Sequence, residues 1–213
     1  MIGRLPSLLA VLALLGAASA ARAQAPSYQP IRVDLTVYGG YAPGDAAAWG
    51  IGAALEPKYN LTDRLSLGLR LEGAGFVTQD VKVSSGSGST ANVSQSARAV
   101  SAFSAKADFY LTTSAVRPFL GISAGLYRIG AGSQSVSGGT VVQSAAAFRG
   151  FGFAPQAGVN LGGFRLAATW HVITGGDMVI ATQAVGAPAP TEVKLSKSFF
   201  AFELGGTFGG ARR

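Results

Sequence analysis

The feature that most constrains the fold of this chain is a two-residue alternation of apolar and polar side chains. In residues 65–72, leucine occupies every odd position, whereas the even positions hold Ser66, Gly68, Arg70 and Glu72. Successive side chains of a β-strand point to opposite faces, so this segment has one apolar and one charged face if it is a strand. The pattern therefore predicts a strand that separates an apolar environment from a polar one.

The same alternation recurs along the chain and divides it into strands. We expect eight of them, at residues 31–41, 48–59, 64–77, 98–111, 117–130, 148–161, 164–173 and 194–208. The connections after the second, fourth and sixth strands are short, and Gly162-Gly163 is typical of a two-residue hairpin turn. The connections after the third, fifth and seventh strands are long and polar.

Two of the long connections carry signals of their own. Gly138-Gly139 in residues 131–147 has the composition of a hairpin tip, so the flanking strands are expected to continue as a protruding ribbon. Met178–Ala181, in the connection at residues 174–193, is an apolar patch that fits either a strand extension or a contact site. If the ribbon or this last connection pairs laterally, the sheet has ten strands instead of eight.

The N-terminus has the composition of a secretion signal. Arg4 precedes a short apolar stretch, and Ala18-Ser-Ala20 or Ala21-Arg-Ala23 provides a small-residue cleavage site. We expect residues 1–23 to be the signal peptide and residues 24–213 to form one domain. Removing Arg4 and Arg22 lowers the formal net charge from +7 to about +5. No clustered basic stripe accompanies this charge, so nucleic-acid binding is not expected.

An exported chain of two-faced strands with alternating short and long connections predicts an all-β protein. We expect a single up-and-down antiparallel transmembrane β-barrel of eight strands, with the apolar faces toward lipid and both termini in the periplasm. A closed barrel makes all its backbone hydrogen bonds between strands, which suits a chain without cysteine.

The polar faces would then fill the barrel lumen. The side chains assigned to this lumen charge network are Arg32, Asp34, Glu56, Lys58, Arg70, Glu72, Lys106, Asp108, Arg117, Arg165, Lys197 and Glu203. Register across the tight turn brings Glu56 opposite or diagonal to Arg70. The same reasoning places Asp108 and Tyr110 near Arg117. We interpret the set as ion pairs that plug the lumen, because unpaired buried charge is costly. The alternative is a narrow polar path.

Aromatic residues test the direction of the apolar faces. Those expected on the lipid face, many of them near its borders, are Trp49, Phe76, Phe103, Phe109, Phe151, Trp170, Phe200 and Phe208. Such rings favour the interfacial layer of a bilayer and form girdles around membrane barrels. In the inverted alternative, a soluble lipocalin-like carrier, the same rings would pack a core.

Motifs for enzymatic chemistry are few. His171 is the only histidine, it lies on the inward face of its strand, and no serine accompanies it at a convincing spacing. A lipid A deacylase or acyltransferase, which pairs His with Ser, is therefore a minor alternative, and we expect no enzyme. With one His and no Cys, no metal site or cofactor is expected.

The terminal run Phe200-Ala-Phe202-Glu-Leu204-Gly-Gly-Thr-Phe208 resembles the alternating, aromatic-ended assembly signal of small outer-membrane barrels. With its eight two-faced strands, residues 31–208 are similar to the OmpA transmembrane domain and to the OmpX and OmpW types. Family members usually end at the aromatic residue, whereas Phe208 is followed by Gly-Gly-Ala-Arg-Arg.

The resemblance implies a monomer in the cell outer membrane of a Gram-negative-type cell. Its partners would be outer-membrane lipid and lipopolysaccharide, with the barrel assembly machinery and periplasmic chaperones during biogenesis. The expected role is structural or surface-interacting, since function in such proteins is carried by loops. The alternative is an OmpW-like narrow channel for small or hydrophobic solutes.

Overall fold

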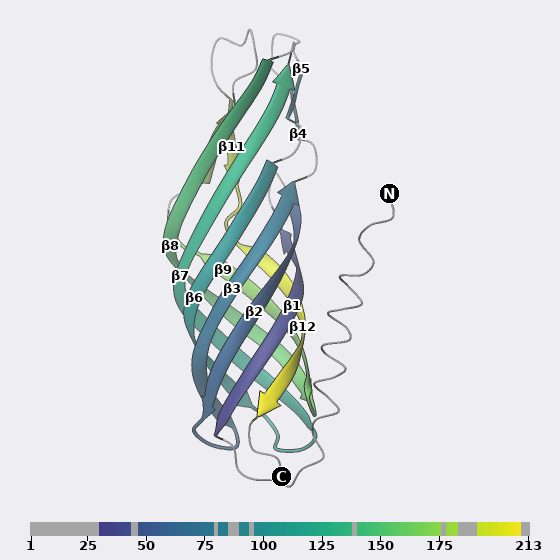
Figure 1. Ribbon diagram of the computed structural model, residues 1–213, viewed down its shortest axis with the longest axis vertical. Coiled ribbons are helices and arrows are strands. Elements are labelled where there is room, and N and C mark those ends of the chain that lie inside the picture. The colour runs from purple at the N-terminus through teal and green to yellow at the C-terminus, as the bar shows by residue number, and fades with distance from the viewer. Residues whose placement is uncertain are drawn as a thin grey trace.

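A computed structural model shows a closed antiparallel barrel, elongated along its axis (Figure 1). It describes residues 30–43, 47–78, 81–84, 90–93, 96–137, 140–175, 178–182 and 191–209. The expected signal peptide, residues 1–23, lies outside this part of the chain. The barrel strands are β1 (Ile31–Ala42), β2 (Ala48–Asn60), β3 (Leu65–Thr78), β6 (Ser96–Tyr110), β7 (Val116–Ser137), β8 (Thr140–Leu161), β9 (Phe164–Ile173) and β12 (Phe199–Gly209).

Each barrel strand pairs with its neighbour in chain order, and β1 pairs with β12 to close the ring. The eight-stranded up-and-down barrel is thereby confirmed, and the ten-stranded alternative is wrong. We call the end with residues 61–64, 111–115 and 162–163 the turn end, and the opposite end the loop end. The first residues of β1 and the last of β12 lie at the turn end, where Arg32 is opposite Gly209.

The tightest turn joins β8 to β9 as its glycine pair predicts. Leu161 pairs with Phe164, and Gly162 between them has a φ of 62°. This left-handed conformation is costly for residues with a Cβ atom, which explains why glycine occupies the position.

The loop end carries additional strands that the alternation alone did not separate. The connection after β3 contains a hairpin of β4 (Val81–Ser84) and β5 (Thr90–Val93), and the one after β9 contains β10 (Met178–Thr182) paired with β11 (Thr191–Leu195). The ribbon expected around Gly138-Gly139 is present, since β7 and β8 stay paired as far as Ser137 and Thr140. In Figure 1 these two strands rise above the rest of the wall.

The last barrel strand is shorter than expected. The interval 194–208 was predicted as one strand, but residues up to Leu195 pair with β10 and the wall begins again at Phe199. The alternation continues through both pieces, so the pattern could not show that the hydrogen-bond partner changes between them. Lys197 consequently lies in the connection rather than in the wall.

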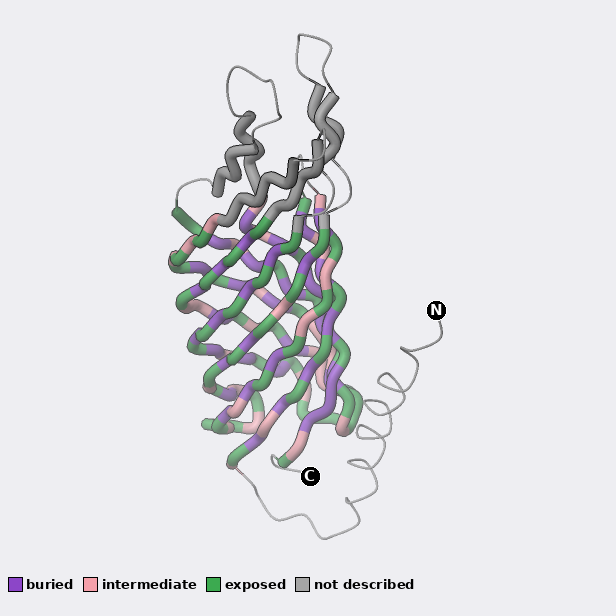
Figure 2. The backbone as a smooth tube through the Cα atoms, turned by 45° about the horizontal axis from the view of Figure 1, so that its top comes forward, coloured by how far each residue is buried: buried purple, intermediate pink, exposed green. Residues whose placement is uncertain are grey.

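Buried and exposed residues alternate along the barrel strands, as Figure 2 shows. Leu67, Leu69 and Leu71 of β3 are exposed on the outer wall, while Arg70 between them is 1% exposed. Phe76 corrects an expectation: it was assigned to the lipid face but is 1% exposed in the interior. It shares the even positions of Arg70 and Glu72, and this parity decides its direction.

Among the described residues, no helix is both long and apolar enough to cross a membrane, a finding that has no bearing on crossing by strands.

Candidate functional site: the barrel interior

Ionisable side chains fill the half of the interior nearer the turn end. Six strands contribute ten of them, which we call the charged layer: Arg32, Asp34, Glu56, Lys58, Arg70, Glu72, Lys106, Asp108, Arg165 and Glu203. All ten are buried, and five cations face five anions. Because an unpaired buried charge is strongly unfavourable, the balance itself is a condition for this interior to exist.

Arg70 holds three carboxylates at the border of the charged layer. Its guanidinium contacts Glu56, its expected neighbour across the β2–β3 turn, and donates to Glu72 at 2.6 Å. On the far side of the barrel it donates to Glu203 at 2.8 Å. A planar guanidinium has five N–H donors, so one arginine can satisfy several carboxylates at fixed geometry.

Lys58 lies at the centre of a second group of carboxylates. Its ammonium is 2.8 Å from Asp34, 2.5 Å from Glu56 and 2.5 Å from Asp108. Oxygen atoms of these three acids lie within 4.8 Å of one another, an arrangement that could ligate a cation. The lysine nitrogen already occupies the place between them, so the geometry favours an internal ion pair over a metal site.

Arg165 and Lys106 connect the remaining members of the layer. Arg165 is 3.2 Å from both Asp34 and Asp108, and Lys106 is 3.0 Å from Glu56. Both cations also donate to the side-chain oxygen of Gln156. Arg32 completes the set by donating twice to Asp34, at 2.7 and 2.9 Å. The layer is therefore a single connected network, in which the neutralisation of each group depends on several strands.

Aromatic rings cover the charged layer at the turn end. The Arg117 guanidinium lies 4.3 Å from the centre of the Tyr110 ring, and Arg165 lies 3.9 Å from that of Phe119. Arg117 also donates to the backbone carbonyl of Asp63. Its expected proximity to Tyr110 is observed, but Asp108 is held by Lys58, Lys106 and Arg165 instead. Asp108 lies deeper in the barrel than Arg117, because β6 and β7 run antiparallel from the turn between them.

The half nearer the loop end is filled differently. We call Tyr38, Phe76, Tyr127, His171 and Phe199 the aromatic layer, and each is at most 4% exposed. His171 stacks on Phe199 with ring centres 4.1 Å apart, and its Nδ1 is 3.1 Å from the Tyr127 hydroxyl. Tyr38 joins the two layers by donating to Glu72 at 2.9 Å.

Two cations reach over the aromatic layer from the loop end. Arg98 lies 4.8 Å from the centre of the Phe76 ring and donates to the backbone carbonyl of Ser196. Lys197 lies 4.3 Å from the centre of the Phe148 ring and donates to the carbonyl of Gly175 at 2.5 Å. The segment between β11 and β12 is thus fastened across the mouth of the barrel.

The structure brings most of the residues assigned to the lumen into one network, but not all of them. Arg117 lies at the turn end and Lys197 at the loop end, each separate from the charged layer. Sequence reasoning left Arg98 out of the interior, and although the alternation puts Tyr38 and Phe199 on inward positions, it gave them no role there. Parity could have placed Arg98 inside, since it is an even residue of β6 like Lys106.

The aromatic residues predicted for the outer wall, Phe76 apart, face outward. The exposed ones are Trp49, Phe103, Phe109, Phe151, Trp170 and Phe200, whereas Phe208 is half-buried. Trp170 and Phe200 stack on adjacent strands with ring centres 5.5 Å apart. The outer wall is therefore apolar and aromatic, while the charged residues are gathered in the half of the interior nearer the turn end.

Comparisons with known proteins bear on the fold. No protein-family model matches the sequence, and no curated protein matches it. The solved structure of the outer membrane protein OprG from Pseudomonas aeruginosa is similar, with a TM-score of 0.56 at 11% identity over 85% of this chain and 98% of that one. Neisserial surface protein A matches with a TM-score of 0.44 at 15% identity, covering 86% of this chain and 97% of that one. The match to OprG shows that the chain has the fold of a small outer-membrane barrel.

Proposed function

We propose that this protein is an exported outer-membrane barrel with a structural or surface-interacting role, whose lumen is plugged by its own side chains. The observation that carries the proposal is the charged layer, in which five cations and five anions neutralise one another across the barrel. An eight-stranded barrel is just wide enough for side chains to fill. Ions could pass only if these pairs separated.

Both ends of the interior support the same proposal. Arg117 and Tyr110 cover the turn end, while Arg98 and Lys197 reach across the loop end. A conducting path would have to cross two covers and two filled layers. The alternative function, a narrow channel, would require all of them to move.

Conductance in a planar lipid bilayer tests the proposal. We expect the refolded wild type to show no sustained conductance, whereas Arg70→Ala, which leaves Glu56, Glu72 and Glu203 without their shared partner, should open measurable events. Leu69→Ala is the matched control, because Leu69 neighbours Arg70 on the same strand but faces outward. Steady conductance by the wild type would overturn the plug and favour the channel.

Location is tested by cell fractionation combined with gel mobility. The exposed apolar wall should place the protein in the outer-membrane fraction, and the unboiled protein should migrate faster than the boiled one, because a closed barrel resists detergent. Recovery from the soluble periplasm without a mobility shift would contradict the proposed location.

An enzymatic role is not part of the proposal. His171 is enclosed by Tyr127 and Phe199 and is fully buried, so lipid on the outer wall does not reach it. We expect the lipid A mass spectrum to be the same in cells that express the wild type or His171→Ala and in cells that lack the protein. A lipid change that depends on His171 would contradict this view.

Surface interaction is assigned to the loop end. The β7–β8 ribbon and the two hairpins are joined to the wall by continuous chain at the end opposite both termini of the barrel. These segments can vary without disturbing the charged layer, since that layer lies nearer the turn end. Assembly as a monomer, guided by the aromatic-ended β12, completes the proposal.

A further inference from the structure

Two neighbouring rungs of the outer wall, each a row of outward-facing residues paired across adjacent strands, differ in their chemistry. Side chains directly opposite one another on β3, β6, β7 and β8 form an apolar rung of Leu71, Phe103, Leu126 and Phe151. The next rung toward the loop end consists of Gly73, Ser101, Arg128 and Arg149. On β7 and β8, two cations therefore follow directly after the apolar rung.

Arg128 and Arg149 face each other directly across the β7–β8 pair, and both are exposed. Like charges in this position repel and destabilise a sheet. Within the described part of the chain, neither arginine has an ion pair that would offset the repulsion. An anion bound between the two guanidinium groups would remove this cost.

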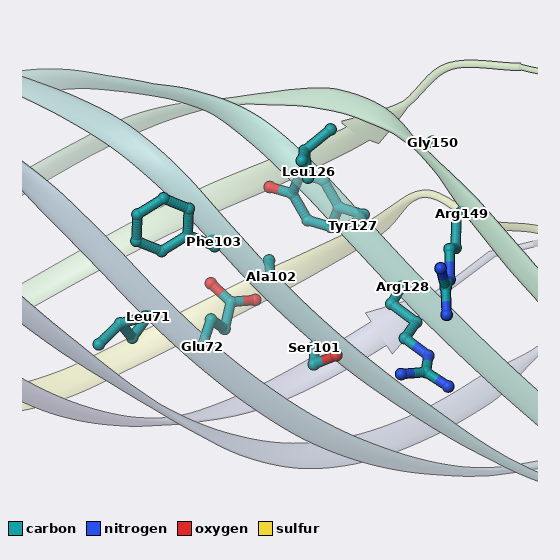
Figure 3. Close-up of a pocket in the computed structure, with 10 residues that line it drawn as sticks. All are labelled: Leu71, Glu72, Ser101, Ala102, Phe103, Leu126, Tyr127, Arg128, Arg149 and Gly150. Atoms are coloured by element: carbon teal, nitrogen blue, oxygen red, sulfur yellow. The ribbon is translucent and has the colours of Figure 1, made fainter.

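The two arginines border a groove of about 560 Å³. The ten described residues that line it all belong to the adjacent strands β3, β6, β7 and β8. Four of them are inward positions of these strands, but the six exposed side chains are Leu71, Ser101, Phe103, Leu126, Arg128 and Arg149, so the groove opens on the outer wall. Figure 3 shows both arginines at one end and Leu71, Phe103 and Leu126 toward the other. The small outward side chain of Ser101 in the middle leaves the space open.

This combination selects a ligand with two chemically different parts. Paired guanidinium groups match the geometry of a phosphate, which they bind through charge-assisted, often bidentate hydrogen bonds. The apolar end of the groove continues the wall that faces acyl chains. A free anion would leave the apolar end unused, and an uncharged lipid would leave the arginines unpaired.

We propose that Arg128 and Arg149 bind the phosphate of an outer-leaflet glycolipid whose acyl chain lies along Leu71, Phe103 and Leu126. The inference rests on the proposed membrane location, since it requires the groove to face the bilayer on the loop side. Ser101, between the two ends, adds a hydroxyl within the same rung. The lipid is thereby held at the border between acyl chains and headgroups.

Native mass spectrometry of the full chain in detergent tests the site with diphosphoryl lipid A and its dephosphorylated form. The double variant Arg128→Gln/Arg149→Gln should bind diphosphoryl lipid A about tenfold more weakly than the wild type, because two charge-assisted contacts are lost. Arg64→Gln is the matched control, since Arg64 is an exposed arginine at the turn end. It should bind as the wild type does, and the wild type should hold dephosphorylated lipid A no better than the double variant.

Equal binding of diphosphoryl lipid A by the wild type and the double variant would overturn the inference. Equally tight binding of inorganic phosphate alone would overturn the assignment to a lipid. Heat-dependent gel mobility of every variant verifies that the barrel has formed. A soluble protein without that mobility shift would overturn the proposed location. An inserted barrel whose lipid A binding does not depend on the two arginines would overturn the lipid site alone.

Discussion

The two halves of the barrel interior fill the same cross-section by opposite means. In the charged layer, each group is buried only because its counter-charges are buried with it, as Lys58 is with Asp34, Glu56 and Asp108. In the aromatic layer, rings such as His171 and Phe199 pack on one another and need few polar partners. Loss of any one charge should therefore lower the stability of the charged layer, whereas the aromatic layer should be destabilised mainly by changes in how its rings fit together.

The largest effect is expected from Lys58→Met, which keeps the length of the side chain but removes the cation between three carboxylates. Breaking a buried ion pair by removing one partner costs about 3–5 kcal/mol. Urea unfolding in lipid vesicles, followed by the fluorescence of the two tryptophans, measures this loss. Arg64→Met removes a cation at an exposed position and should change the free energy of unfolding far less. Equal losses would mean that the charged layer is not a network.

A smaller loss of stability is expected when a single tyrosine hydroxyl is removed, and its size should differ between the two layers. Tyr38→Phe removes the hydrogen bond to the Glu72 carboxylate and should cost about 1.5–3 kcal/mol, the range for bonds to charged groups. Tyr127→Phe removes the hydrogen bond to the His171 ring nitrogen and should cost about 0.5–1.5 kcal/mol, the usual net range for a hydrogen bond within a protein. The same unfolding assay compares the two. A larger loss for Tyr127→Phe would contradict the division into layers.

A third effect, of similar size, concerns the fit of the Tyr38 ring. A Cβ atom at Gly52 would meet the Tyr38 ring, so Gly52→Ala must displace that ring from its bond to Glu72. Overpacking of this kind typically costs about 1–3 kcal/mol. Gly39→Ala is the matched control on the adjacent strand, because nothing lies within 4 Å of its Cβ position. If both substitutions were equally tolerated, the close fit around Tyr38 would not matter for stability.

Alternation of side chains was sufficient to predict the wall of the barrel, since the period of two decides the face of every residue. It also gave the contact of Arg70 with Glu56, because a short turn fixes their register. The error at Phe76 came from weighing its aromatic character above its parity.

Contacts across the lumen could not be predicted. Arg70 and Glu203 lie on strands that are not adjacent, so their contact depends on how the closed sheet is staggered and not on any local pattern. The start of β12 at Phe199 was missed for a related reason, since the alternation does not reveal a change of pairing partner. Arg128 and Arg149 became visible as a pair only through the register of β7 and β8.

The central claim, that side chains plug the lumen, is tested most directly by the chemical accessibility of one interior position. The chain contains no cysteine, so a single Ser123→Cys substitution, beside Lys106 in the register of β6 and β7, provides a unique thiol inside the barrel. Ser114→Cys in the exposed β6–β7 turn is the control. A charged thiol reagent should label Ser114→Cys at once and Ser123→Cys only after unfolding. Rapid labelling of both in the folded barrel would show that an aqueous path reaches the charged layer and would contradict the plug.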